Sequence, residues 1–141
     1  MTIFRFSLIA VGLSCGAGLA QDAAIALPQD AAIALPSGQF ATLIETIWEP
    51  QTAPVELWVR FRFLVPGISG ADLDFAVVGD DLLALCQTVA LPAIAKAGKV
   101  ADQAVISLAS QAIPFGEVNP DVTQYFEAYR LTGGDCILEG F

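Results

Sequence analysis

The fold is decided by the stretch Asp80-Asp81-Leu82-Leu83-Ala84-Leu85-Cys86-Gln87-Thr88-Val89-Ala90-Leu91. Its apolar residues recur at spacings of three and four and form one stripe of an α-helix. The stripe comprises Leu82, Leu85, Cys86, Val89 and Ala93. Two aspartates open the stretch and two lysines follow it, the charge order that the helix dipole favours. Pro92 cannot donate a backbone hydrogen bond, so we expect a kink or a break into two helical pieces there.

The clearest strand lies upstream of this helix, from Val55 to Val65. One side of its alternating pattern carries Val55, Leu57, Val59, Phe61, Phe63 and Val65, and the other carries Glu56, Trp58, Arg60, Arg62 and Leu64. Such alternation is typical of an antiparallel sheet covered on one face. Further strand candidates are 40–48, 73–78 and 104–109. We therefore predict an α+β fold: a mainly antiparallel sheet of five or six strands with one kinked helix packed on one face.

The C-terminal segment predicts a β-hairpin and a disulfide. Residues 123–131 and 135–141 flank Gly133-Gly134, which suits a tight turn with positive φ at both central positions. This register places Leu131 opposite Cys136 and Arg130 opposite Ile137. If that side of the hairpin meets the helix, Cys136 can pair with Cys86. The bridge would contribute about 4 kcal/mol on chain-entropy arithmetic; the alternative is two free buried thiols.

Residues 1–20 have the pattern of a secretory signal peptide. Arg5 supplies the positive charge, an uncharged and mostly apolar run follows, and Gly18-Leu19-Ala20 offers small residues at a cleavage position. An uncleaved anchor, or a lipoprotein signal ending at Cys15, are the alternatives. Cleavage after Ala20 leaves two cysteines in the mature chain. We therefore predict a periplasmic or secreted protein in an oxidising compartment.

A perfect tandem duplication follows the leader. The eight residues Gln21-Asp22-Ala23-Ala24-Ile25-Ala26-Leu27-Pro28 recur unchanged at 29–36. Two such short copies cannot form a solenoid, so we interpret 21–36 as a tolerant linker. The alternative is an extended tether or a partner-binding arm. A single domain is then expected over 37–141, beginning near Ser37-Gly38.

Composition excludes several classes of function. The chain has 141 residues, 15 acidic and 6 basic side chains, no histidine and a net charge of −9. Too few cations are present to neutralise a nucleic acid or an anionic membrane surface. Lack of histidine removes Ser-His-Asp and Cys-His nucleophile pairs and histidine-ligated zinc or haem. We expect no cofactor and no membrane span in the mature chain.

Several segments together resemble a known family. They are 85–92 (LCQTVALP), 105–108 (VISL) leading to 114–116 (PFG), 123–130 (TQYFEAYR) and 136–141 (CILEGF). The chain is similar over residues 37 to 141 to a family of small exported alphaproteobacterial proteins, a domain of unknown function. The resemblance implies export and the domain boundary, and it implies no activity or site residues.

One group of side chains suggests a binding surface on the polar side of the sheet. Its members are Trp58, Arg60, Arg62 and Arg130. Guanidinium groups beside an exposed tryptophan suit a small anionic ligand or an acidic segment of an envelope protein. The alternative is cross-strand ion pairing with Glu45, Glu56 and Glu139 on a solvated face. The first function we predict is thus a non-catalytic binding or accessory module.

Two acidic groupings give weaker alternatives. Glu127 falls between two tyrosines on the expected core side, where burial would raise the pKa of its carboxyl, and Glu117 would be the second carboxylate of a pair. That pair would make the protein a small hydrolase. An acidic set surrounds the start of the helix: Asp72, Asp74, Asp80 and Asp81. Its spacing departs from a calcium loop and suits a helix N-terminus, so we predict no metal site.

Overall fold

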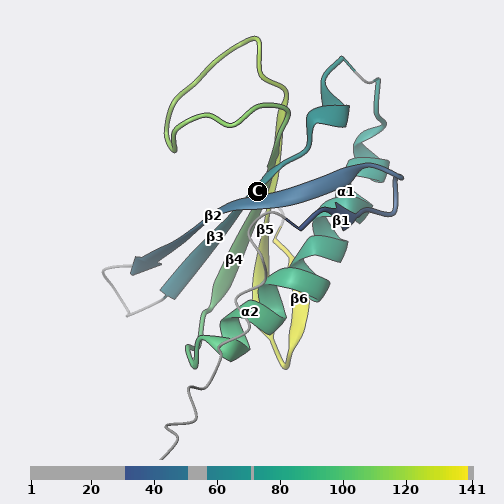
Figure 1. Cartoon of the computed structure of the whole chain (residues 1–141). Helices are drawn as coiled ribbons and strands as arrows, with labels where there is room; N and C mark the ends of the chain where they lie inside the picture. Colours follow the sequence, from purple (N-terminus) through teal and green to yellow (C-terminus); the bar gives the residue numbers. More distant parts are fainter. Residues whose placement is uncertain (1–30, 51–56, 71, 140–141) are drawn as a thin grey trace, which may run out of the picture.

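A six-stranded sheet with one long helix on one face forms the domain, over the residues that the structure describes (Figure 1). The computed structural model describes residues 31–50, 57–70 and 72–139. Strands β1 to β6 lie side by side in chain order. Their bounds are β1 (Ile33–Ala34), β2 (Phe40–Pro50), β3 (Leu57–Leu64), β4 (Gln103–Ala109), β5 (Gln124–Thr132) and β6 (Asp135–Leu138). Only β3 and β4 are parallel neighbours, because the helix connects them. The predicted α+β class and strand number are confirmed.

The helix begins earlier than its apolar stripe suggested. It consists of α1 (Phe75–Leu85), a π-helical segment η2 (Cys86–Ala90) and α2 (Leu91–Lys96); a short 3-10 turn η1 (Pro66–Ile68) precedes it. The Asp74 carboxylate accepts a hydrogen bond from the Ala76 backbone N–H, at 3.1 Å, and so caps α1. The prediction of a strand over 73–78 is wrong, because this cap starts the helix within that segment.

The interruption expected at Pro92 takes the form of a π turn. The backbone N–H of Leu91 donates to the carbonyl of Cys86, five residues back. Pro92 then occupies one of the first two positions of α2, where a missing N–H costs little. The wider turn therefore lets one helix of 22 residues, Phe75–Lys96, continue past the proline.

The hydrophobic core lies between this helix and the sheet. The inward residues of β3, Val59, Phe61 and Phe63, are fully buried and pack with Leu82 and Leu85 of α1. By length and composition alone the helix could cross a membrane, as the core helices of many soluble proteins could. Here its apolar side meets the sheet, as expected for a domain with a single packed face.

The C-terminal hairpin has the predicted register. Leu131 lies opposite Cys136 and Arg130 opposite Ile137. Gly133 and Gly134 both adopt positive φ, at 62° and 82°, where a side chain would be strained. Cys136 therefore faces the helix, and it forms a disulfide with Cys86 across a Cα–Cα distance of 6.3 Å. The predicted bridge thus fastens the middle of the helix to the last strand.

Part of the second repeat copy belongs to the folded domain. β1 pairs with β2 through Ile33 opposite Ala41, and Leu35 is buried in the core. The backbone N–H of Ser37 donates to the carboxylate of Asp81 at 2.9 Å and ties this turn to α1. The folded domain therefore includes residues that precede the expected boundary near Ser37. The expected leader and the first copy lie outside the described residues.

Candidate binding surface on the open sheet face

The side of the sheet turned away from the helix, which we call the open face, carries all four predicted binding residues. Trp58, Gln103 and Arg130 lie opposite one another on β3, β4 and β5 and so form one row. Arg60 and Arg62 follow at two-residue intervals along β3 and point to the same side. The structure thus brings the four residues together on one face, and their role in binding stays a prediction.

Each arginine of this face has a carboxylate partner. Arg60 Nη2 lies 3.3 Å from Glu49 Oε2, and Arg62 pairs with Glu45 from the same neighbouring strand. Arg130 pairs with Glu139, which follows β6. Two of the glutamates named by the ion-pair alternative, Glu45 and Glu139, thus take that role. Glu49 supplies the partner of Arg60, and Glu56 lies outside the described residues.

The loop between β4 and β5 folds over one end of the open face. The Phe115 ring centroid is 5.0 Å from Arg60 Cζ and 5.8 Å from Arg62 Cζ, within the range of cation–π contacts. Arg62 also donates to the backbone carbonyl of Ile113. The two arginines therefore hold the loop, and a hollow of about 190 Å³ between them and Phe126 remains beneath it.

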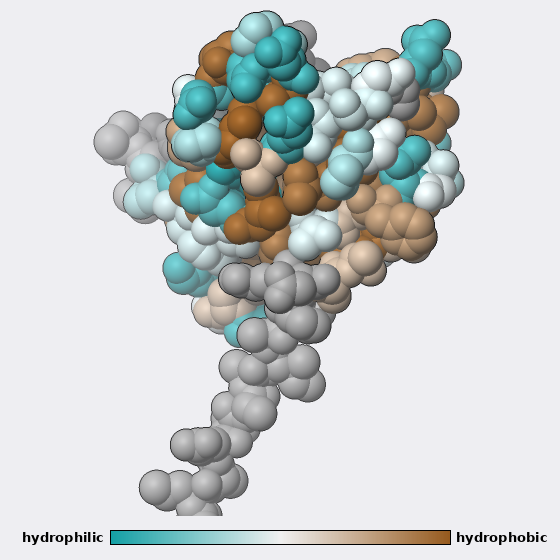
Figure 2. Space-filling model, turned by 45° about the horizontal axis from the view of Figure 1, so that its top comes forward, coloured by the Kyte–Doolittle hydropathy of each residue, from teal (hydrophilic) through white to brown (hydrophobic). Residues whose placement is uncertain are grey.

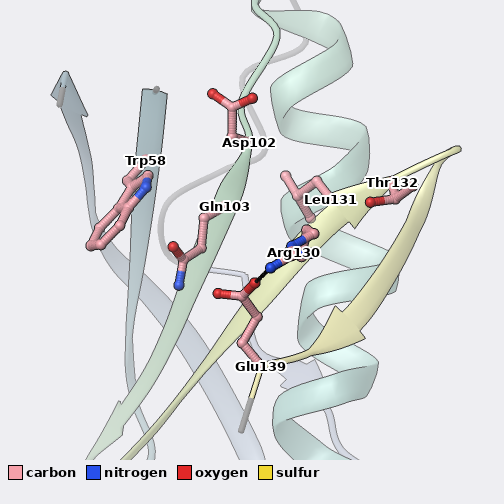
Figure 3. A pocket seen from close by; sticks show the side chains of 7 residues that line it. All are labelled: Trp58, Asp102, Gln103, Arg130, Leu131, Thr132 and Glu139. Carbon is pink, nitrogen blue, oxygen red and sulfur yellow. Dashed lines mark ion pairs between the residues drawn. The ribbon is translucent and has the colours of Figure 1, made fainter. Parts of the chain in front are cut away.

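A larger hollow, of about 410 Å³, lies at the row of Trp58, Gln103 and Arg130 (Figure 3). The Arg130–Glu139 pair forms one wall and the indole of Trp58 stands across Gln103 from it. Its volume falls within the range of about 300–1,000 Å³ typical of small-molecule sites. We call this cavity the row hollow.

Apolar side chains are also exposed on the open face. Phe115, Phe126 and Ile137 are each at least half exposed. In the view of Figure 2, hydrophobic and hydrophilic residues lie side by side on the surface. Exposed aromatic groups beside arginines are the composition enriched in protein interfaces.

The sheet separates the two carboxylates of the hydrolase alternative. Glu117 lines the hollow under the loop on the open face. Glu127 is buried on the helix side, where its Oε1 lies 3.6 Å from a Cβ built on Gly79. It accepts a hydrogen bond from the hydroxyl of Tyr129, and burial followed by this bond raises the pKa of Tyr129 well above its usual value. No cleft among the described residues brings the two glutamates together, so the predicted pair is not formed.

Two of the four aspartates near the helix start have structural roles. Asp74 caps α1 and Asp81 is buried with a bond from the backbone of Ser37. Within 31–50, 57–70 and 72–139, no three potential metal-binding side chains lie together.

The chain matches one known protein family. The model of a family of unknown function, DUF6497, matches residues 14–141. The chain belongs to this family. The match covers the whole described domain together with both repeat copies. Neither the curated proteins nor the solved structures include a significant match.

Three contributors to the open face of this DUF6497 domain were missed in the sequence. They are Glu49, Gln103 and Phe115. Glu49 lies four residues from Glu45 and therefore on the same side of β2, so alternation could have found it; it was missed because the predicted strand ended at residue 48, whereas β2 continues to Pro50. Gln103 and Phe115 depend on the pairing of β4 with β3, which is set by the long helical connection.

Proposed function

We propose that this DUF6497 domain is an exported, non-catalytic binding module that uses its open face to hold a small ligand or a protein of the cell envelope. The observation that carries the proposal is the row of Trp58, Gln103 and Arg130, which lines a hollow of ligand size on the open face. Fixed polar groups beside an aromatic ring are the usual make-up of such sites.

The ion pairs of the open face limit the classes of partner that it can bind. Glu45, Glu49 and Glu139 each occupy an arginine, so an acidic ligand would have to displace a carboxylate already in place. Displacement costs the ligand much of what it would gain from a charge-assisted bond. We therefore favour a partner without strong negative charge over the small anionic ligand that the sequence alone suggested.

Export is supported by the cysteines. The disulfide joins Cys86 and Cys136, while Cys15 lies within the segment that resembles a signal peptide. Disulfides persist in oxidising compartments and are rare in the cytosol. A mature chain beginning at Gln21 would hold one bridge and no odd thiol. The intact mass of protein recovered from the periplasm would test cleavage after Ala20 and oxidation together.

Capture from an envelope extract tests the binding role. Arg130→Ala is the informative variant, because the Arg130 side chain is 68% exposed and its removal spares the core. Lys99→Ala is the matched control, because Lys99 follows the end of α2 and its ammonium lies over Trp48. We expect a component retained by the wild type and by Lys99→Ala but lost with Arg130→Ala. Equal retention by all three, or a protein that stays in the cytoplasm, overturns the proposal.

A further inference from the structure

The walls of the row hollow combine one aromatic surface with hydrogen-bonding groups of both kinds. Trp58 supplies an indole face, Gln103 an amide with donors and an acceptor, and Thr132 a hydroxyl. Arg130 and Glu139 supply a guanidinium and a carboxylate held against each other. A ligand in this hollow can therefore both donate to and accept from the protein while it packs on a ring.

Both carboxylates of the hollow already have a hydrogen-bonding partner. The carboxylate of Asp102 accepts from the backbone N–H of Leu57 at 2.8 Å, and that of Glu139 holds Arg130. A cation would have to compete with Arg130 or with the Leu57 N–H for these carboxylates, and an anion would be repelled by both of them. The hollow is therefore suited to a neutral polar ligand.

We infer that the row hollow binds a neutral saccharide, an inference that rests on the proposed binding role of the open face. A sugar ring has an apolar face of C–H groups, which packs on an indole, and adjacent hydroxyls that each donate and accept. The ion pair fixes a planar donor beside a planar acceptor before the ligand arrives, which lowers the ordering cost of binding. The wall formed by Arg130 and Glu139 thus matches a pair of neighbouring hydroxyls.

The two tryptophans of the chain make a direct assay possible. Trp58 lines the row hollow, whereas Trp48 packs against the core and lies under Lys99, whose Nζ is 4.2 Å from its ring centroid. Two indole N–H signals are expected in a nitrogen–proton NMR spectrum, and Trp58→Phe assigns them. The full mature chain is titrated with maltose, chitobiose and galactose, and with citrate and putrescine as charged probes.

We expect at least one saccharide to shift the Trp58 signal while the Trp48 signal stays in place. Gln103→Ala should weaken the binding of that saccharide about tenfold, because it removes a hydrogen-bonding group at the centre of the row. Gln87→Ala, the same change on an exposed helix position, should leave the affinity unchanged. A shift with citrate or putrescine alone overturns the saccharide inference but leaves the binding face standing. No shift with any probe overturns the inference, and the capture experiment with Arg130→Ala then decides the binding role separately.

Discussion

Removal of the disulfide is the perturbation whose effect can be worked out most fully. The bridge joins residues 50 apart, and closing a loop of that length in the unfolded chain corresponds to about 4 kcal/mol. A domain of this size has a total stability of about 5–15 kcal/mol. We therefore expect the reduced protein, or the double variant Cys86→Ala/Cys136→Ala, to lose a large share of its free energy of unfolding.

Urea denaturation followed by far-ultraviolet circular dichroism measures that loss. Reduced wild type and the double variant separate two effects, since both lack the crosslink but only the variant also loses the buried sulfur of Cys86. The variant should thus be the less stable of the two. The slope of free energy against urea should rise in both, because an unlinked chain exposes more surface on unfolding. A loss below about 1 kcal/mol on reduction would refute the entropic reasoning.

Three further changes probe the helix side and the loop. Gly79→Ala should stabilise the domain by about 0.5–1 kcal/mol in urea denaturation, because alanine favours the helix. The added Cβ would lie 3.6 Å from Glu127 Oε1, an ordinary van der Waals distance. A lower stability of the variant would show that the methyl group does not fit against Glu127. The fold raises the pKa of Tyr129, so the folded state favours the neutral phenol. The stability that this contributes is complete below about pH 10 and falls at higher pH, because the tyrosine of the unfolded chain then ionises. Tyr129→Phe should remove this contribution to the fall, measured as urea midpoints on either side of pH 10. Arg62→Ala should cost about 1–2 kcal/mol and speed proteolysis in the loop 110–123, and Arg62→Lys should not rescue it, since one ammonium cannot replace both bonds of the guanidinium.

Local periodicity predicted the elements whose partners are close in sequence. The hairpin register that pairs Leu131 with Cys136 followed from the two glycines, because a two-residue turn permits only one register. The inward set of β3 followed from strict alternation, since a strand has a side-chain period of two.

The errors arose where a single polar side chain outweighed the apolar pattern. Residues 73–78 are β-prone, yet the cap by Asp74 makes Phe75 the first helical residue. β1 falls within a perfect repeat, and eight identical residues cannot reveal which copy pairs with β2. Leu35 is buried because it lies beside the turn that Asp81 holds, a contact 44 residues apart in sequence.

For the candidate binding surface, the sequence predicted which residues of one strand or hairpin share a side, and it did not predict which strands are neighbours. Trp58, Arg60 and Arg62 share one side by alternation, and Arg130 joined them through the hairpin register. Gln103 completes the row only once β4 is set parallel to β3 across the helical connection, and pairings at that separation are set by the packed core. The same long-range pairing puts Glu117 and Glu127 on opposite sides of the sheet, which spacing alone could not show.

The pairing of Arg130 with Glu139 on the open face calls for a reason other than stability. An exposed ion pair contributes about 0–1 kcal/mol, so the bond between Arg130 and Glu139, on a side chain 68% exposed, adds little to folding. An acidic chain with six basic residues nevertheless places three of them on this one face. Each is paired with a glutamate, so the surface offers hydrogen-bond donors and acceptors that are already oriented. Under the proposed binding role, such a face would discriminate by hydrogen-bond geometry and shape, which favours a neutral, polar partner over a charged one.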